Sequence, residues 1–250
     1  MKLLLLAAML PFAASAAECT VRSGAQTNAL VELYTSEGCS SCPPAEQWLS
    51  QFARTPREGV VALAFHVHYW DYIGWKDIYA DPRNTERQRA FAATTGARSV
   101  YTPQVIVAGH DFRLWSSDKA FDEAVRATRS RKAAASIEIT PRRAADGAIE
   151  GTVSATMAET TQSPHTLVVV VAQDGITSRP TAGENKGETL AQNFVVRDVA
   201  EFRGTGTIAG TFRFTPKANW IPERLSVVAY VQDPRSGHVL QALTAPSCRG

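Results

Sequence analysis

The sequence lacks the patterns that mark several large classes of protein. It has no long lysine or arginine run and a formal net charge of +2, which argues against a dedicated nucleic-acid surface. It has no internal repeat and no low-complexity tract. Beyond its first residues it has no apolar run long enough to cross a bilayer, so we expect a protein that is not embedded in a membrane. What is present, 44% hydrophobic and 20% charged residues, is typical of a globular chain with a buried core.

The first sixteen residues have the features of an export signal. Lys2 supplies a positive start, residues 3–10 are apolar, and residues 14–16 form a small-residue cleavage pattern. Glu18 before Cys19 does not suit a lipoprotein cleavage site. We therefore expect a signal peptide over residues 1–16 and a periplasmic or secreted protein, with an uncleaved membrane anchor as the alternative.

Cysteine is scarce, and its four positions allow three pairings: Cys19, Cys39, Cys42 and Cys248. Cys39 and Cys42 are natural partners because only two residues separate them. Cys19 and Cys248 lie at the two ends of the mature chain, and the termini of domains often lie close together. We expect a structural disulfide between these two; two independent thiols, or a bond from one of them to another molecule, are the alternatives.

Two different patterns divide the mature chain. Up to residue 131, apolar runs at 29–34, 60–67 and 102–108 predict strands, and helices are predicted from Cys39 onward, over 84–95 and over 118–128. The first two strands should be parallel because a helix connects them. Beyond residue 131, helical periodicity disappears, and strand-like runs alternate with turn residues at 136–140, 148–155, 167–172, 194–199, 207–214, 225–231 and 239–243. The patterns predict an α/β domain over 17–131 and an all-β antiparallel sandwich domain over 132–250, with the polar segment 178–188 as a surface loop.

The Cys39-Ser-Ser-Cys42 motif is the strongest chemical signal in the chain. It follows a predicted strand and opens a predicted helix, where free N–H groups and the helix dipole favour a thiolate. Cys39 is then the expected nucleophile, and Cys42, one helical turn away, would resolve a mixed disulfide. A fixed structural disulfide and half of a zinc site are the alternatives, although no second C-x-x-C or ligand-spaced histidine pair accompanies the motif.

The stretch from Val31 to the cysteine motif resembles the thioredoxin superfamily, and Tyr101-Thr102-Pro103 resembles the cis-proline loop of that superfamily. The resemblance implies a thioredoxin-like first domain, a cis bond before Pro103 and contact between Thr102 and substrate. An ordinary trans proline at a strand start is the alternative. The sequence Trp-Cys-Gly-Pro-Cys-Lys is absent, and no histidine lies between the cysteines, so neither reductant nor oxidase behaviour is implied.

More narrowly, the chain resembles a bacterial family catalogued as domain of unknown function 1223. The matching stretches are 37–44, 64–77, 85–89, 101–104 and 193–198. This resemblance implies fold and secretion, and it implies no activity.

A loop rich in aromatic residues follows the second predicted strand. It contains six candidate binding residues: His66, His68, Tyr69, Trp70, Asp71 and Trp75. Ligands of open α/β sheets bind beyond the carboxyl ends of strands, so this loop would approach the cysteines. It suits a peptide-binding ledge or proton transfer during thiol exchange. Simple core packing, and a copper site formed by Cys39, Cys42, His66 and His68, are the alternatives.

The sequence thus favours an exported thiol–disulfide oxidoreductase that acts on protein thiols, with no cofactor and with a membrane redox donor as a candidate partner. Two other functions stay open. One is a non-catalytic binding module with a thioredoxin-like fold and a structural disulfide, and the other is Cu(I) handling.

Overall fold

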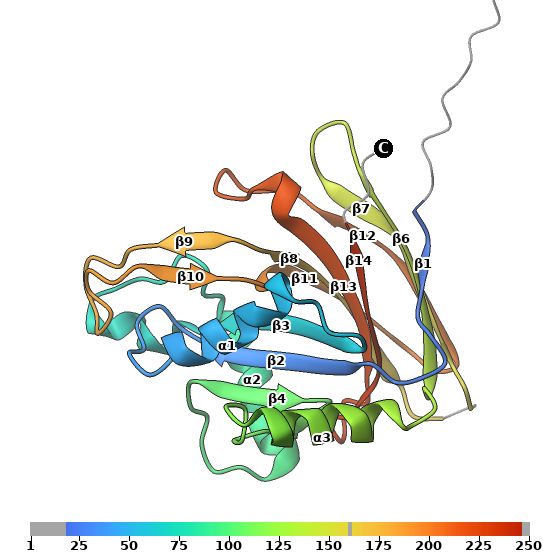
Figure 1. The fold of residues 1–250 in the computed structure, drawn as a ribbon. Helices are drawn as coiled ribbons and strands as arrows, with labels where there is room; N and C mark the ends of the chain where they lie inside the picture. The colour runs from blue at the N-terminus through green and yellow to red at the C-terminus, as the bar shows by residue number, and fades with distance from the viewer. Residues whose placement is uncertain (1–18, 160–161, 247–250) are drawn as a thin grey trace, which may run out of the picture.

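The computed structural model describes residues 19–159 and 162–246, and Figure 1 shows their path. Its helices are α1 (Pro43–Arg54), α2 (Pro82–Thr95) and α3 (Asp118–Arg129), with short 3₁₀ helices η1 (His68–Ile73) and η2 (Pro222–Arg224). Its strands are β1 (Val21–Arg22), β2 (Ala29–Thr35), β3 (Val60–His66), β4 (Gln104–Val107), β5 (His110–Asp111), β6 (Ala135–Arg143), β7 (Ile149–Met157), β8 (His165–Gln173), β9 (Ile176–Ser178), β10 (Leu190–Gln192), β11 (Val195–Gly204), β12 (Thr207–Phe214), β13 (Leu225–Gln232) and β14 (Val239–Pro246).

Proline and polar capping residues set the ends of the helices. α1 begins at Pro43, where the missing N–H is no loss because the first turn has no partner for it. The side chains of Asp81 and Ser117 accept bonds from N–H groups at the starts of α2 and α3. α2 ends at Gly96, whose φ of 71° lies in the left-handed region that glycine adopts easily. These local signals explain why the three helices lie close to their predicted positions.

Strands from both halves of the chain form one eight-stranded sheet. Its order is β14-β13-β8-β11-β3-β2-β4-β5. β2 and β3 are parallel, as predicted from the helix that connects them, and β4 runs antiparallel to β2. β11 pairs in parallel with the other edge of β3, through Val195 opposite Ala64. This pairing brings β8, β13 and β14 into the same sheet.

The prediction of an α/β thioredoxin-like domain followed by a separate antiparallel sandwich domain is wrong. The molecule is mostly β, and strands from both parts of the chain share its two larger sheets. β1, which precedes β2, pairs with β6 in a four-stranded sheet of order β1-β6-β7-β12. If β3 were an edge strand, the N–H and C=O groups on its open side would lack strand partners. Pairing with β11 supplies partners for some of these groups. The unbroken apolar run of β8 was a signal that both of its faces are covered, because a strand with one solvated face would alternate apolar and polar residues.

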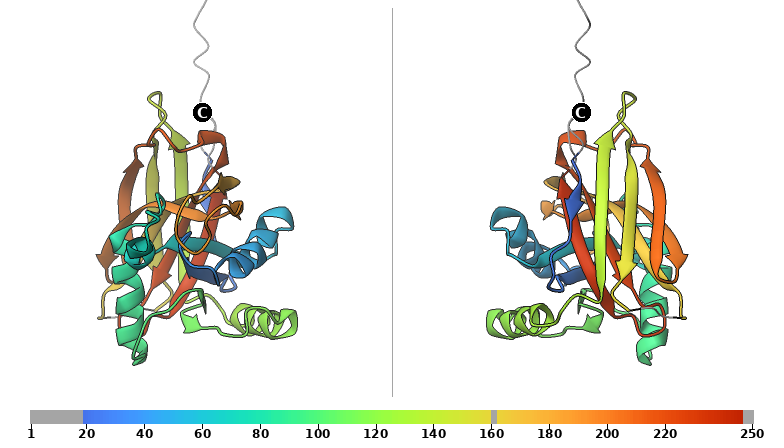
Figure 2. Two further views of the ribbon diagram at one scale, coloured as in Figure 1. Left: turned by 90° about the vertical axis from the view of Figure 1, so that its left-hand side faces the viewer. Right: turned by 90° about the vertical axis from the view of Figure 1, so that its right-hand side faces the viewer.

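β8 is buried on both faces because it lies between two cores. Leu167 and Val169 belong to the core between the large sheet and the four-stranded sheet. Val168 and Val170 belong to the core on the opposite face. Figure 2 shows the four-stranded sheet as an outer layer, which packs over the part of the large sheet formed by β8, β13 and β14.

The helices cover both faces of the part of the large sheet formed by β2, β3 and β4. α1 and α3 pack with Val31 and Leu33 on one face. α2 packs through Phe91 with Phe65 on the other face (Figure 2). The carboxyl ends of β2 and β3 therefore lie beside the start of α1, and the cysteine motif is at this point. Within residues 19–159 and 162–246, no helix is long and apolar enough to cross a membrane.

Candidate functional site

The two cysteines of the motif form a disulfide at the start of α1. β2 ends at Thr35, a short loop follows, and Cys42 is the residue that precedes the first turn of α1. The Cα atoms of Cys39 and Cys42 lie 5.5 Å apart, within the usual range for a disulfide. Both cysteines are fully buried, with 0% of their surface exposed. The predicted pairing is therefore present, but no sulfur atom is open to solvent.

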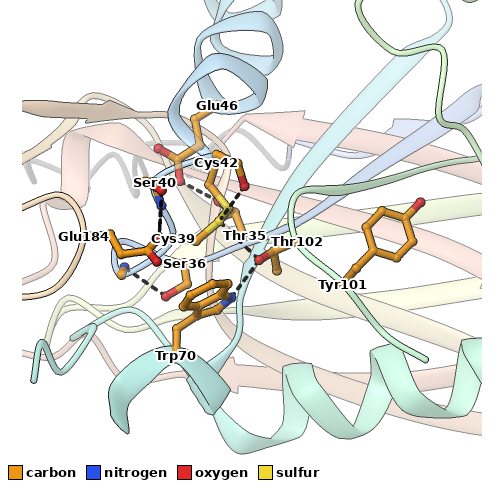
Figure 3. Close-up of a disulfide and its surroundings, with 12 residues drawn as sticks. Thr35, Ser36, Cys39, Ser40, Cys42, Glu46, Trp70, Tyr101, Thr102 and Glu184 are labelled. Carbon is orange, nitrogen blue, oxygen red and sulfur yellow. Dashed lines mark hydrogen bonds between the residues drawn. A yellow bond between two sulfur atoms is a disulfide. The ribbon is translucent and has the colours of Figure 1, made fainter. Parts of the chain in front are cut away.

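The loop before β4 contacts Cys39 directly. The bond between Thr102 and Pro103 is cis, as the resemblance implied. The hydroxyl of Thr102 donates to Sγ of Cys39 at 3.3 Å, and Nε1 of Trp70 donates to the same hydroxyl at 2.7 Å (Figure 3). Tyr101 points away from the disulfide, and its hydroxyl donates to Asp111 at 2.7 Å. The structure thus brings Thr102 to the sulfur and leaves Tyr101 out of this contact.

The predicted aromatic binding loop divides into several different environments. Trp70 reaches the cysteine site through Thr102. His68 shares a hydrogen bond of 2.8 Å with the hydroxyl of Thr85, and Tyr69 donates to Gln88 at 3.2 Å, so both side chains face α2. Tyr72, a further aromatic residue of the same loop, is 83% exposed.

The remaining candidates of this loop lie around a buried polar cluster, with His66 buried and Asp71 and Trp75 half-buried. Nδ1 of His66 lies 2.6 Å from Oδ2 of Asp77, and both side chains are fully buried. Asp71 accepts from the N–H of Asp77 at 3.3 Å, and Trp75 donates to the carboxylate of Glu37 at 2.8 Å. These contacts connect the aromatic loop to Glu37 and Asp77, and a binding role for the half-buried Asp71 and Trp75 stays a prediction.

Four buried ionisable groups make up this cluster, which we call the buried tetrad: Glu37, Glu46, His66 and Asp77. The N–H of Glu37 donates to Asp77 at 2.9 Å, and the hydroxyl of Thr35 donates to Glu46 at 2.6 Å. Thr35 and His66 are opposite each other in the paired strands β2 and β3, so the tetrad lies at the carboxyl ends of these strands. Nε2 of His66 is buried and has no hydrogen-bond partner among the described residues.

Burial and mutual charge shift the pKa values of the tetrad in different directions. Burial by itself would lower the pKa of His66, but the charge of Asp77, its hydrogen bond and the nearby glutamates raise this pKa to about 9. The pKa of Asp77 is lowered, because the imidazolium and two backbone N–H groups outweigh its burial. Burial raises the pKa values of Glu37 and Glu46. At neutral pH the cluster therefore contains an Asp77–His66 ion pair.

Sequence reasoning missed Glu37 and Glu46. Glu46 lies three residues before Leu49 on the buried face of α1. A carboxylate on this apolar stripe could have indicated a buried polar site. Glu37 follows a fully buried strand by two residues, and that position was a weaker signal.

Sequence reasoning also missed the polar segment between β9 and β10. This segment was expected only as a surface loop, yet Glu184 accepts from the N–H and hydroxyl of Ser40, at 2.9 and 2.7 Å (Figure 3). Nδ2 of Asn185 donates to the carbonyls of Glu37 and Cys39, at 2.8 and 3.0 Å. No local pattern could have shown this, because the partners are more than 140 residues apart.

Two other predicted sites receive no support from the described residues. The proposed Cys19–Cys248 disulfide lies outside them, because Cys248 is not described. The described side chains contain no group of three or more histidine, cysteine, aspartate or glutamate residues that could hold a metal ion, so the copper set does not come together.

A cavity of about 480 Å³ lies on the face of the large sheet that α2 covers, between α2 and the strands. Its lining includes a buried ion pair in which Arg87 donates to Glu32 at 2.7 Å, with the guanidinium against the rings of Phe65 and Tyr230. None of the predicted site residues lines this cavity.

The fold and the site together define a mostly β protein with a buried Cys-x-x-Cys disulfide where a strand leads into a helix. The chain belongs to the family described as protein of unknown function (DUF1223), whose model matches residues 30–232. No curated protein matches the chain.

Two of the solved structures that are similar to the chain have TM-scores above 0.6. Protein AGR_C_4864 from Agrobacterium tumefaciens is 23% identical, with a TM-score of 0.63 over 90% of this chain and 96% of that chain. HBP35 of Porphyromonas gingivalis is 14% identical, with a TM-score of 0.65 over 90% of this chain and 76% of that chain. At these identities the likeness concerns the fold alone.

Proposed function

We propose that the protein is an exported thiol–disulfide oxidoreductase that acts on protein thiols through a mixed disulfide at Cys39, resolved by Cys42. The observation that carries this proposal is the contact between the Thr102 hydroxyl and Sγ of Cys39, at the start of a helix. A hydroxyl donor and the positive end of a helix dipole both stabilise a thiolate relative to a thiol. Cys39 would therefore be the better leaving group and the better nucleophile of the pair.

Each turnover would exchange two electrons between disulfide and dithiol. In the oxidising direction, a substrate thiolate attacks Sγ of Cys39, the Cys39–Cys42 bond breaks, and Cys42 leaves as a thiolate that takes up a proton. A second substrate thiolate then attacks the substrate sulfur of the mixed disulfide and releases Cys39 as a thiolate. The substrate gains a disulfide, and the cysteine pair gains the two electrons. Reduction of substrates follows the same steps in reverse.

The likeness to the thioredoxin superfamily, on this proposal, is restricted to the cysteine loop, α1 and the Thr102–Pro103 loop. The export signal over residues 1–16 supports a periplasmic or secreted location, where disulfides persist. A membrane redox protein that restores the starting state of Cys39 and Cys42 is the partner that such a location would require.

The decisive experiment is measurement of the reduction potential of the pair in glutathione buffers. The redox state is read by alkylation, digestion and mass analysis of the peptide that carries Cys39 and Cys42. We expect equilibration at a measurable glutathione ratio, and we expect a Cys42→Ser variant to accumulate a mixed disulfide at Cys39. A pair that stays oxidised at every glutathione ratio and in excess dithiothreitol would contradict the proposal.

One observation favours a second candidate, a non-catalytic binding module with a structural disulfide. The sulfur atoms of a turning-over pair must be reachable, and both cysteines here are 0% exposed. The same experiment separates the two functions, since a structural disulfide resists mild reductants.

A further inference from the structure

The segment that covers the cysteine loop is the connection between β9 and β10, residues 179–189, which we call the latch loop. Its Glu184 carboxylate accepts two bonds from Ser40, and its Asn185 amide donates to the carbonyls of Glu37 and Cys39. Asn185 is only 4% exposed, although it belongs to a polar loop. The latch loop thus makes four hydrogen bonds to the residues around Cys39.

The latch loop is also fitted sterically against η1 and the cysteine loop. Gly183 has a φ of +75°, and a Cβ atom there would lie 3.1 Å from Cβ of Trp75 and 3.4 Å from Cδ1 of Ile73. A Cβ atom on Gly38 would meet the same Ile73 atom at 3.3 Å. Ile73 is therefore packed between the two loops.

We propose that Glu184 and Asn185 are specificity-determining residues of the cysteine site, an inference that rests on the proposed redox function. They hold the latch loop closed over Cys39, and thiol exchange proceeds only after these four bonds open. A thiol must then enter the space between the latch loop and η1. Small thiols and cysteines on flexible polypeptide segments can do this, whereas a cysteine on a rigid folded surface is excluded.

The step that the latch controls is the first thiol attack. With dithiothreitol as the probe, its thiolate attacks Sγ of Cys39, the Cys39–Cys42 bond breaks, and Cys42 leaves as a thiolate. The second thiol of the probe then closes a cyclic disulfide and releases Cys39. Two electrons pass from the probe to the protein, and the two protons of its thiols are distributed between the cysteines and solvent.

The test compares reduction rates of the Cys39–Cys42 pair by dithiothreitol in the full chain. Because each bond has a modest net effect, we expect Glu184→Ala to raise the rate about threefold or more and Asn185→Ala about tenfold or more. The matched control is Glu188→Ala, since Glu188 is exposed on the same loop and none of its side-chain bonds is to the cysteine loop. We expect this variant to keep the wild-type rate.

A second control separates opening of the latch from loss of global stability. Leu167→Ala weakens the core far from the latch loop, and urea unfolding measures its effect. Faster reduction in Asn185→Ala than in a Leu167→Ala protein of equal or lower stability supports the latch. Equal rates in the wild type and both latch variants, or equal acceleration by Glu188→Ala, would refute it.

The outcomes also distinguish the latch from the proposed function. If the wild type equilibrates with glutathione and the latch variants keep its rate, the latch is wrong and the redox function stands. If the pair resists dithiothreitol in the wild type and in every variant, the redox function fails, and with it the latch. A reduced peptide with one cysteine should oxidise faster with the wild type than a folded protein with one surface cysteine, and the opposite order would overturn the specificity.

Discussion

Replacement of Asp77 by asparagine tests the buried tetrad most directly. The substitution keeps the size of the side chain and removes the negative charge 2.6 Å from Nδ1 of His66. In the wild type, the carboxylate also accepts from the N–H groups of Glu37 and Tyr79, both at 2.9 Å. An asparagine can accept only through Oδ1, so its NH₂ group would face a donor. The variant therefore loses both the ion pair and a hydrogen bond.

The expected loss in the free energy of unfolding is about 3 kcal/mol at pH 6. The pKa of His66 rises from 6.5 to about 9, and at about 1.4 kcal/mol per unit this shift corresponds to about 3 kcal/mol. Removal of one partner from a buried ion pair typically costs about 3–5 kcal/mol. We expect the lower part of that range, because the unpaired imidazole of His66 can lose its proton.

The loss should depend on pH in a defined direction. The folded-state pKa of His66 lies above its unfolded value, so the stabilisation is fully present below about pH 6.5 and is lost as pH rises through about 9. The difference between the wild type and Asp77→Asn should therefore shrink between pH 6 and pH 9.5. The lowered pKa of Asp77 affects stability only in acid, outside this window.

Urea unfolding followed by tryptophan fluorescence at pH 6, 8 and 9.5 measures these differences. The matched control is Asp198→Asn, which removes an exposed partner of Arg83, and exposed ion pairs contribute about 0–1 kcal/mol. A loss below 1 kcal/mol for Asp77→Asn at pH 6, or a loss that stays constant up to pH 9.5, would refute the ion pair.

Three further predictions concern other parts of the molecule. Thr102→Val removes the donor to Cys39, so we expect the pKa of that thiol in the reduced protein to rise by about one unit, measured from the pH dependence of its alkylation rate; an unchanged pKa contradicts the role of this hydroxyl. Leu167→Ala should cost about 2–5 kcal/mol, and because the sheet is continuous, fluorescence and circular dichroism should report one shared unfolding transition; two separate transitions would indicate independent domains. Arg87→Met leaves Glu32 buried without its partner and should cost about 3–5 kcal/mol, most of which a Glu32→Leu change in the same chain restores; a double variant as unstable as the single variant contradicts this account.

Local signals in the sequence predicted most secondary structure. Pro43, Ser117 and Gly96 act through their own backbone and nearest neighbours, so the helices they start or end could be located without the fold. The pairing of Cys39 with Cys42 is equally local, because three positions of separation at a helix start place the two sulfur atoms within reach.

The domain organisation could not be read in the same way. Turn residues punctuate the strands after residue 131 whether those strands form their own sandwich or extend an existing sheet. The one discriminating feature was β8, whose residues from Leu167 to Ala172 are apolar without alternation. That run shows that both faces of β8 are covered, but it does not show which segments cover them.

The site shows the same division between local and tertiary information. The sequence by itself determined that a Cys-x-x-Cys pair opens a helix after a buried strand, and that an aromatic loop follows the next strand. Only the tertiary structure decided that Thr102 reaches Cys39, that His66 is buried against Asp77, and that Asn185 closes the cysteine loop. The physical reason is that periodicity and capping depend on neighbours within about one turn or one strand, whereas burial and charge pairing depend on which distant segments meet. In this protein, contacts between distant segments determine whether the cysteine pair is accessible.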